Sequence, residues 1–386
     1  TDIMASGLSK NILRVLSPEQ QGGNNTEKTE ITWFALSSFD WFIYKMSAAV
    51  GTNDVDGVFD AGNDDCQWNR VGGPDSEDYF MLDFNMFYSG GTGTEQDPYI
   101  ISNRADLSSI GLYPEDWDDY FIIVNDIDMG SVPSYKFSLI APDFSTNRFS
   151  GSIDGQDHKI SNLQLYRNDG DSFSNLGLVC NLDGSGVIKN IVLEDPNIIN
   201  ESPDDYGTGG IVGNKEGVIQ NCHVRNGSIQ GANYVGGICG KSHMGWIKSC
   251  SNDADINSGK YAGGVSGYNS GGCHIWNSCA GGTVAGNTKS GGITTVNHSG
   301  DIQNCYSYTL INSGSQRGGV LTENLSGGIA VACFWDTEAS GQSSSAAGTG
   351  LTTEDMMDVQ NYITAGWDFI RIWNIIDEKT YPMHRN

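Results

Sequence analysis

Short apolar segments recur along the second half of the chain at a nearly constant spacing. In one series each segment ends in a cysteine or another apolar residue, and these last residues lie 28, 31, 28, 29, 26 and 28 positions apart. The series consists of Ile160-Ser-Asn-Leu163, Ile188-Lys-Asn-Ile191, Ile219-Gln-Asn-Cys222, Ile247-Lys-Ser-Cys250, Trp276-Asn-Ser-Cys279, Ile302-Gln-Asn-Cys305 and Ala330-Val-Ala-Cys333. A fixed period of this length is typical of repeat architectures, in which every repeat is one supersecondary unit.

Two further series keep the same step. One places a pair of glycines before Ile or Val, and its apolar members are Ile211, Ile238, Val265, Ile293 and Val320. The other consists of Ile229, Ile256, Val284 and Ile311. Helical repeats need stretches of about ten or more residues with few glycines, and these segments are too short and too rich in glycine. We therefore expect three strands in each period.

The predicted fold is all-β: a right-handed parallel β-helix, or solenoid, of about seven to eight three-stranded rungs. Each strand pairs in parallel with its equivalent one rung away, at about 4.8 Å. A single rung cannot bury its own apolar face, whereas stacked rungs share a continuous core. The right-handed sense follows the general preference of parallel crossovers.

The glycines, asparagines and cysteines have predicted places in the rung. The paired glycines fit a corner that side chains would obstruct. An amide ladder capping turn carbonyls is predicted at Asn162, Asn190, Asn221 and Asn304, together with Ser249 and Ser278. A stacked column of buried, unbridged thiols is predicted at Cys222, Cys250, Cys279, Cys305 and Cys333. Metal binding is disfavoured because the column contains no C-x2-C pair, and the rung spacing exceeds that of a relaxed disulfide.

The remaining segments define four predicted regions. Residues 1–88 form a small β-rich module for attachment, assembly or capping, and residues 89–149 lead into the solenoid. Residues 150–335 are the repeats, and residues 336–386 are a C-terminal cap. Within the first region the step of four at Met4, Leu8, Ile12 and Leu16 predicts a short helix, and residues 31–49 and 79–88 read as strands. In the cap, five apolar residues are expected to cover the far end of the solenoid: Trp367, Phe369, Ile372, Trp373 and Ile375.

Charge narrows the class of protein. The formal net charge is −26, from 21 basic and 47 acidic residues. Residues 209–335 differ from the rest, with 5 acidic and 7 basic residues. Nucleic-acid binding is excluded because it needs a basic face to neutralise phosphates. No run of 18 apolar residues exists, so we expect no membrane span. The start at Thr1 is what signal removal would leave on an exported protein, and we predict an extracellular or cell-surface location.

Several motifs resemble bacterial GLUG-repeat surface proteins. The segment Gly91-Thr-Gly-Thr-Glu-Gln-Asp-Pro-Tyr-Ile-Ile-Ser resembles their lead-in, and Phe149 to Leu163 resembles the opening of their solenoid. Cys333-Phe-Trp-Asp-Thr-Glu-Ala-Ser-Gly and the residues up to Thr380-Tyr-Pro resemble their closing segment. The resemblance covers about residues 89–386 and implies a large extracellular, often adhesin-like protein. The family has no single activity, so it supplies no catalytic residues.

A catalytic alternative must also be weighed, because many polysaccharide lyases and hydrolases are parallel β-helices. They need carboxylates, or a carboxylate with a base, clustered on neighbouring rungs. Asp253 and Asp255 are the candidates, with Lys241 or His243 as a partner, although solvated turn residues explain them equally well. No signature of a serine hydrolase, zinc protease or nucleotide-binding fold is present. We therefore predict that the chain is not an enzyme.

Two candidate binding sites remain. The glycine-punctuated loop containing Asp54, Asp56, Asp60 and Asp64 offers oxygen ligands that suit a structural Ca²⁺, although it lacks the terminal glutamate of an EF-hand and a plain acidic loop is the alternative. Tyr234 and Tyr261 occupy equivalent positions on adjacent rungs. They form either a carbohydrate-binding strip or a stabilising stack.

These features together predict a non-enzymatic extracellular structural or adhesive surface protein, with a polysaccharide-degrading or carbohydrate-binding β-helix as the alternative. No cofactor is required, and the structural Ca²⁺ is the one candidate ion. The expected partner is either another copy of the chain, assembled into a filament or layer through residues 1–88, or a surface glycan or protein. Packing of residues 1–88 onto the solenoid of the same chain is the alternative to assembly.

Overall fold

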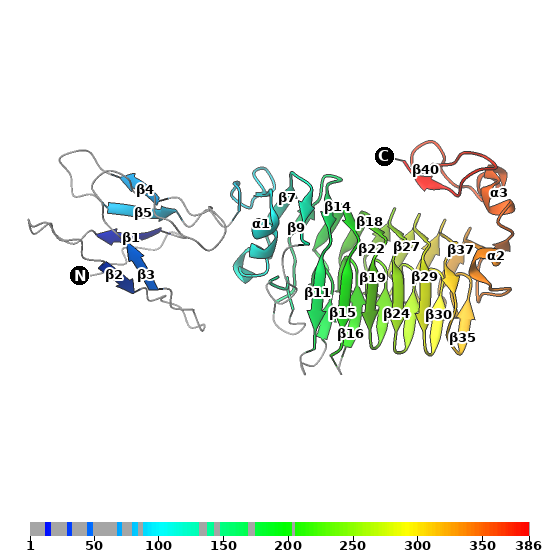
Figure 1. Cartoon of the computed structure of the whole chain (residues 1–386). Helices are drawn as coiled ribbons and strands as arrows, with labels where there is room; N and C mark the ends of the chain where they lie inside the picture. The colour runs from blue at the N-terminus through cyan, green and yellow to red at the C-terminus, as the bar shows by residue number, and fades with distance from the viewer. Residues whose placement is uncertain are drawn as a thin grey trace, which may run out of the picture. The chain divides into compact units, whose positions relative to one another are not determined.

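The computed structural model describes residues 88–385 except 131–136, 143–146, 169–173 and 203–204, together with the backbone of five strands before residue 88. The chain divides into one unit of residues Thr1–Phe87 and a second of residues Tyr88–Asn386 (Figure 1). The second unit contains the repeats.

The five described strands of the first unit form two antiparallel sheets. β1 (Ile12–Leu16) and β4 (Trp68–Val71) both pair with β5 (Tyr79–Asp83), and β2 (Thr29–Thr32) pairs with β3 (Lys45–Ala48). The predicted helix is therefore wrong at its second half, because Ile12–Leu16 is extended and pairs with β5 along its whole length. Ile and Val suit a strand, and pairing with a distant segment overrides the step of four. Met4 and Leu8 lie outside the described residues.

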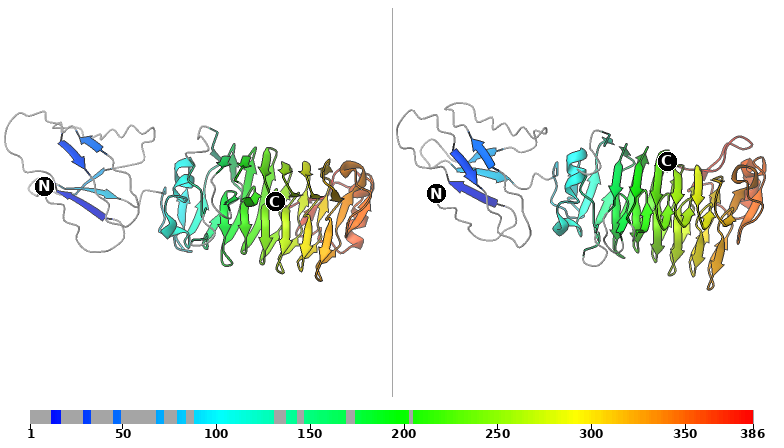
Figure 2. Two further views of the ribbon diagram at one scale, coloured as in Figure 1. Left: turned by 90° about the horizontal axis from the view of Figure 1, so that it is seen from below. Right: turned by 60° about the horizontal axis from the view of Figure 1, so that its bottom comes forward.

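The second unit is a parallel solenoid of about seven turns, which confirms the predicted fold (Figures 1 and 2). Four parallel sheets run along it. The first is the sixteen-stranded sheet described in the next paragraph, and the second, third and fourth each contain six strands. The second sheet contains β11 (Gln164–Arg167), β15 (Asn197–Asn200), β19 (Ser228–Gly231), β24 (Asp255–Ser258), β29 (Thr283–Gly286) and β34 (Leu310–Ile311). The third sheet contains β12 (Ser174–Leu176), β16 (Asp205–Gly209), β20 (Tyr234–Gly236), β25 (Tyr261–Gly263), β30 (Lys289–Gly291) and β35 (Gln316–Gly318). The fourth sheet contains β13 (Val179–Leu182), β17 (Val212–Lys215), β21 (Cys239–His243), β26 (Ser266–Ser270), β31 (Val296–His298) and β36 (Glu323–Leu325).

A sixteen-stranded sheet, the long sheet, completes the coil. Its first strands are β6 (Tyr99–Ile101), β7 (Tyr120–Ile123), β8 (Ile127–Asp128), β9 (Ser152–Asp154), β10 (Lys159–Ser161), β14 (Val187–Glu194) and β18 (Val218–Arg225). Later rungs divide each long strand into two, giving β22 (Trp246–Lys248), β23 (Ser251–Asn252), β27 (His274–Trp276), β28 (Cys279–Ala280), β32 (Asp301–Gln303), β33 (Tyr306–Ser307), β37 (Ile329–Val331), β38 (Phe334–Asp336) and finally β39 (Thr349–Leu351).

Few helices accompany the strands. α1 (Arg104–Ser109) begins at Asn103, whose side chain accepts hydrogen bonds from two backbone N–H groups of its first turn. The other elements are the 3-10 helices η2 (Pro114–Asp116) and η4 (Asp355–Met357), the helices α2 (Thr337–Ser340) and α3 (Val359–Thr364), and the antiparallel pair β40 (Trp373–Asn374) and β41 (Met383–His384).

The predicted inward columns form the core. The Ile229 series pairs residue by residue along the second sheet. The Ile211 series lies between the third and fourth sheets, and all five of its members are fully buried. The first four donate their backbone N–H to the next rung, as from Ile211 to Ile238 at 3.1 Å, and Val320 donates to the hydroxyl of Ser345 at 3.0 Å. The glycine-containing segment of each rung is therefore divided at this corner into two short strands.

The glycines explain that corner. A Cβ atom added to Gly237 would overlap the side chain of Asn252 and the carbonyl oxygen of Gly264, and one added to Gly236 would overlap the carbonyl oxygen of Cys239. Strands of the third and fourth sheets thus approach each other more closely than any side chain permits.

Strand pairing corrects the predicted alignment in two rungs. Ile275, and not Trp276, pairs with Ile247 and Ile302. Ser278 is therefore equivalent to Cys250 and Cys305, and its hydroxyl accepts a hydrogen bond from the backbone N–H of Cys250 at 3.2 Å. The stacked thiol column includes Cys222, Cys250, Cys305 and Cys333 but not Cys279, which lies one position further along the strand. Ile160 likewise pairs with Leu193, whereas Ile153 occupies the column of Ile188.

The same shift changes the predicted amide ladder. The equivalent position is left-handed in every rung from Asn190 onward, and its occupants are Asn190, Asn221, Ser249, Asn277, Asn304 and Ala332, with φ between 49° and 55°. Asn221 donates to Asn190 at 3.0 Å, so an amide contact exists at this position. Asn recurs there because its short polar side chain tolerates the left-handed conformation.

A different polar ladder lies inside the solenoid. Asn269 donates to the side-chain oxygen of Asn297 at 2.8 Å, and Asn297 donates to Asn324 at 2.9 Å. Lys215 occupies the same column two rungs earlier and is fully buried. Its Nζ donates to the carbonyl oxygens of Gly217 at 3.1 Å and Met244 at 2.6 Å. These side chains satisfy turn carbonyls that would otherwise be buried without partners.

The residues from 356 to 385, here called the C-terminal clasp, pack against the side of the solenoid. Tyr306, on the outward face of β33, contacts Trp367 and Trp373 at ring-centroid distances of 6.1 and 5.8 Å. His384 donates to the carbonyl oxygen of Asn277, 107 residues earlier, at 2.7 Å. Cys279 points outward into this cluster and not into the thiol column.

The end of the solenoid is covered by a different segment. The backbone N–H of Ala346 donates to Leu321 at 2.9 Å, and β39 pairs with β38. The prediction that Trp367 and Trp373 cover the far end is therefore wrong, because the segment that contains them folds back along the outer face of the long sheet.

Candidate functional site

Four tyrosines form a strip on the outward face of the third and fourth sheets. Tyr234 of β20 and Tyr261 of β25 stack at 5.1 Å with an interplanar angle of 12°. Tyr268 of β26 lies 5.1 Å from Tyr234, and Tyr206 of β16 meets Tyr234 edge-on at 6.1 Å. All four are half-buried. This set, here called the tyrosine strip, brings together the two tyrosines identified from the sequence and two that were not.

Two lysines border the tyrosine strip. Lys241 of β21 places its Nζ 3.8 Å from the centroid of the Tyr206 ring and donates to the Tyr206 hydroxyl. Lys289 of β30 forms an ion pair with Glu323 at 2.5 Å. Burial, followed by the neighbouring tyrosines, raises the pKa of Tyr234 above its usual value. The phenol therefore remains protonated at neutral pH and can donate a hydrogen bond.

The stacking limits what the strip can do. Tyr234 and Tyr261 cover each other's faces, so a sugar ring cannot stack between them. Their contact is worth about 0.5–1.5 kcal/mol beyond the area buried. The strip therefore stabilises adjacent rungs and presents the ring edges, hydroxyls and ammonium groups outward.

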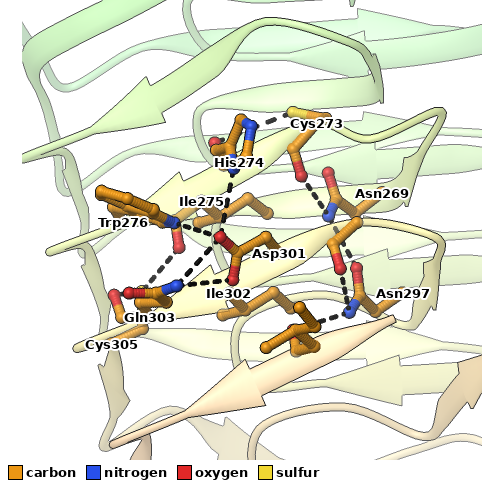
Figure 3. A network of polar contacts seen from close by, with 12 residues as sticks. Asn269, Cys273, His274, Ile275, Trp276, Asn297, Asp301, Ile302, Gln303 and Cys305 are labelled. Carbon is orange, nitrogen blue, oxygen red and sulfur yellow. Dashed lines mark hydrogen bonds and ion pairs between the residues drawn. The ribbon is translucent and has the colours of Figure 1, made fainter. Parts of the chain in front are cut away.

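A second outward cluster lies on the long sheet and is here called the tryptophan patch (Figure 3 shows its residues His274, Trp276, Asp301 and Gln303). Trp246 of β22 and His274 of β27 stack at 4.1 Å with an angle of 18°. Trp276 lies nearly perpendicular to both, at 86° and 81°. Asp301 of β32 accepts hydrogen bonds from His274 at 3.2 Å, from Trp276 Nε1 at 3.1 Å and from Gln303 at 3.0 Å. Lys248 completes the patch, because it pairs with Trp276 in strand register.

Sequence reasoning missed the tryptophan patch, although a signal for it existed. Residues on either side of an inward Ile point outward, since side chains alternate along a strand. With Ile247, Ile275 and Ile302 aligned, Trp246, His274 and Asp301 fall in one outward column. Aligning Trp276 with the isoleucines moved that rung by one position and hid the column.

The predicted carboxylate site does not assemble. Asp253 accepts a hydrogen bond from Tyr308, and Asp255 accepts one from the backbone N–H of Thr283 at 3.0 Å. The predicted partners bond elsewhere: Lys241 contacts Tyr206, and His243 contacts the Ser270 hydroxyl at 3.2 Å. No hydrogen bond or ion pair links either aspartate to Lys241 or His243 in the described residues.

In the central rungs, His274 and Asp301 form an acid–base pair at 3.2 Å. Cys273 precedes His274 in the chain, but its thiol is fully buried and lies 3.4 Å from Lys215 Nζ, whereas His274 is half-exposed on the opposite face. Alternation along the strand therefore separates this thiol from the imidazole. In the described part of the chain, neither a nucleophilic side chain nor a second carboxylate is hydrogen-bonded to the side chains of this pair.

The predicted Ca²⁺ ligands Asp54, Asp56, Asp60 and Asp64 lie outside the described residues. Within the described ranges, no group of three or more His, Cys, Asp or Glu side chains is arranged to hold a metal ion. The eight cysteines in those ranges are buried, and none of them forms a disulfide. Cys66 lies outside them. Burial raises the pKa of the Cys222 and Cys305 thiols well above the usual value, which keeps them protonated and unreactive.

Comparison with known proteins supports the fold and identifies relatives that match this chain over part of their length. No family model matches the chain. Halomucin of Haloquadratum walsbyi is 30% identical over 169 residues, which is 42% of this chain and 2% of halomucin. A protein of Evansella cellulosilytica, provisionally named a Gly-rich membrane protein, is 27% identical over 398 aligned positions, covering 77% of this chain and 45% of the relative. The chain therefore spans less than half the length of either relative.

A solved structure shares the fold. A protein of Bacteroides ovatus, provisionally named an immunoglobulin A1 protease, superimposes with a TM-score of 0.56 and 21% identity, covering 78% of this chain and 96% of that one. At this identity the likeness concerns the fold alone. Among the described residues, no helix is long and apolar enough to cross a membrane.

Proposed function

We propose that this chain is a non-enzymatic extracellular surface protein that acts by adhesion or assembly through the outer faces of its solenoid. The observation that carries the proposal is the display of ordered, half-buried aromatic side chains on the outward faces of the middle rungs. The tyrosine strip and the tryptophan patch are held by contacts between rungs, so both are rigid before any ligand arrives. A preorganised surface loses little conformational entropy on binding, which favours recognition.

The names of the relatives support an extracellular or surface location. One is named halomucin and the other a Gly-rich membrane protein. A long parallel solenoid suits a surface role because it is an extended scaffold with repeated faces. The resemblance to GLUG-repeat surface proteins points in the same direction.

The proposal is tested by retention of the full chain on immobilised mucin, collagen, pectin and chitin. We expect retention on at least one surface, and we expect the double variant Tyr234→Ser/Tyr261→Ser to lose part of it. Tyr166→Ser is the matched control, since Tyr166 is an exposed tyrosine on β11 of the second sheet. Failure of the full chain to bind any surface, together with a monomeric mass in solution, would contradict the proposal.

Polysaccharide degradation is the second candidate, and the His274–Asp301 contact at 3.2 Å is the observation that favours it. Against it, Asp301 already accepts bonds from three side chains, so it has little capacity left for a substrate or water. Release of reducing ends or unsaturated products from pectin or chitin, abolished by Asp301→Asn or His274→Gln, would favour the enzyme.

A further inference from the structure

We propose that the tryptophan patch is a binding site for an acidic sugar residue, whose ring packs on Trp276 and whose carboxylate lies beside Lys248. This inference names a ligand class for the outer face of the solenoid and so rests on the proposed function.

Trp276 differs from the stacked aromatic pairs of the two outward clusters in how its ring is held. Tyr234 with Tyr261, and Trp246 with His274, stack face to face and cover one another. Trp276 is perpendicular to both of its aromatic neighbours, and neither is stacked on its face. Its Nε1–H is fixed to Asp301, so the ring has a defined orientation. A half-exposed, oriented indole offers the flat apolar surface against which a sugar ring packs.

Lys248 supplies a positive charge that has no carboxylate partner among the described residues. It pairs with Trp276 in register, on the adjacent rung. No ion pair links Lys248 to a carboxylate in the part of the chain that the structure describes, whereas Lys159, Lys189 and Lys289 each have one. Residues 209–335 hold 7 basic and 5 acidic residues in a chain of net charge −26. An anionic ligand is repelled by most of this protein and attracted to these rungs.

Polar groups around Trp276 complete the site. Gln303 donates to both oxygens of Asp301 at 3.0 Å, which leaves its side-chain oxygen available to accept a sugar hydroxyl. Asp301 is a positioning residue here, since it orients Trp276 and Gln303. His274 also donates to Asp301, so three neutral or cationic groups disperse its negative charge. One acidic sugar unit therefore meets an apolar face, a cation and an amide within three rungs.

The test is titration of the full chain with a hexamer of galacturonic acid and, separately, with neutral cellohexaose, at low and high salt. Binding is followed by calorimetry and by the indole N–H resonances of the ¹⁵N-labelled protein. We expect the acidic hexamer to bind with a Kd of about 1 mM or tighter and to shift the Trp276 indole signal. Trp276→Ala should weaken this binding at least about tenfold, in line with the energy of stacking on an aromatic side chain. Trp276→Phe should retain part of it.

Lys248→Gln should weaken binding of the acidic hexamer and flatten its salt dependence. Tyr166→Ala is the matched control and should change nothing, and thermal melting identifies variants that fail to fold. Absence of binding by the wild-type chain, or equal binding by Trp276→Ala, overturns the inference. If the wild-type chain binds both hexamers with equal affinity and Lys248→Gln leaves both affinities unchanged, the assignment of the ligand to acidic sugars is wrong. Retention on mucin or collagen with no response to either hexamer leaves the proposed function standing while this inference falls.

Discussion

The contact between the C-terminal clasp and the solenoid should weaken as the pH falls below neutrality. His223 of β18 and His384 of the clasp lie 5.3 Å apart, and His384 also stacks on Trp373 at 4.4 Å. Burial, then the neighbouring His384 and Arg225, lowers the pKa of His223 from 6.5 to about 3. Burial also lowers the pKa of His384, although its bond to Asn277 opposes this. The imidazole of His223 is therefore neutral in the folded protein at mildly acidic pH, and the lowered pKa of His384 disfavours its protonation as well.

The magnitude follows from proton linkage. Below pH 6.5 the unfolded chain protonates His223 while the folded chain does not until about pH 3. Stability from this residue is therefore fully present above pH 6.5 and decreases by about 1.4 kcal/mol per pH unit below it. At pH 4.5, two units lower, the loss is about 3 kcal/mol. His384 changes stability in the same direction.

Asp205 opposes this trend. Burial raises its pKa to about 6, so its contribution is fully present below the unfolded value of 3.8 and is lost as the pH rises through 6. The stability of the wild type therefore contains two opposite dependences on pH: as the pH falls, His223 lowers the stability and Asp205 raises it. The difference between the wild type and His223→Gln isolates the histidine, because glutamine can bond to Ser251 and Asn221 but does not titrate.

The assay is urea unfolding at pH 7.5, 6.0 and 4.5, followed by tryptophan fluorescence, since Trp367 and Trp373 lie in the clasp. We expect the stability advantage of the wild type over His223→Gln to shrink by about 3 kcal/mol between pH 7.5 and 4.5. A difference that stays constant within about 0.5 kcal/mol, the typical error of such comparisons, refutes the reasoning.

Four further predictions follow from the fold and from the sequence. Denatured, unreduced protein should expose at least eight titratable thiols while the native protein exposes far fewer, because eight cysteines are buried and form no disulfide; finding one or none contradicts the unbridged thiol column. Gly237→Ala should cost at least about 3 kcal/mol in urea unfolding, since its Cβ would overlap Asn252 and Gly264, whereas Gly184→Ala has nothing within 4 Å and should be nearly neutral; equal effects would contradict the close approach at the corner. Sedimentation should give a larger mass for the full chain than for a version starting at Gly90, and two monomers at high concentration, with or without Ca²⁺, would rule out assembly through residues 1–88. Calorimetry should detect Ca²⁺ binding to the full chain that is lost when Asp54, Asp56, Asp60 and Asp64 are replaced by Asn; unchanged heats would leave the loop as a plain acidic segment.

The repeat made the solenoid predictable, because short β-branched segments with a fixed step leave few alternatives to stacked parallel strands. The columns of Ile211 and Ile229 were found correctly, since each series keeps one residue type through several rungs. The rung of Ile275 was misaligned because a cysteine stands one position beyond Ser278. Aligning that cysteine with the others placed Trp276 in the column of inward isoleucines. The outward column that forms the tryptophan patch was therefore not recognised.

Contacts that the repeat does not encode could not be predicted. The clasp packs against Tyr306, a residue whose equivalents in neighbouring rungs are Cys279 and Phe334, so no periodic signal marks the face it covers. Lys215 was equally hidden, because a lysine in a strand is usually exposed. Its burial depends on two carbonyl oxygens supplied by turns of its own and the following rung.

The clasp also determines how the solenoid would respond to tension at its C-terminal end. A bare stack of rungs peels from the end, because each rung contacts only its neighbours and their bonds break one rung at a time. Here His384 is bonded to Asn277, Tyr306 to Pro382, and Trp367 to Ala332, so the clasp reaches several rungs back from the end. Force along the axis therefore loads these contacts together, in shear, before any rung detaches. This arrangement therefore increases the resistance of the solenoid to extension without a disulfide among the described residues.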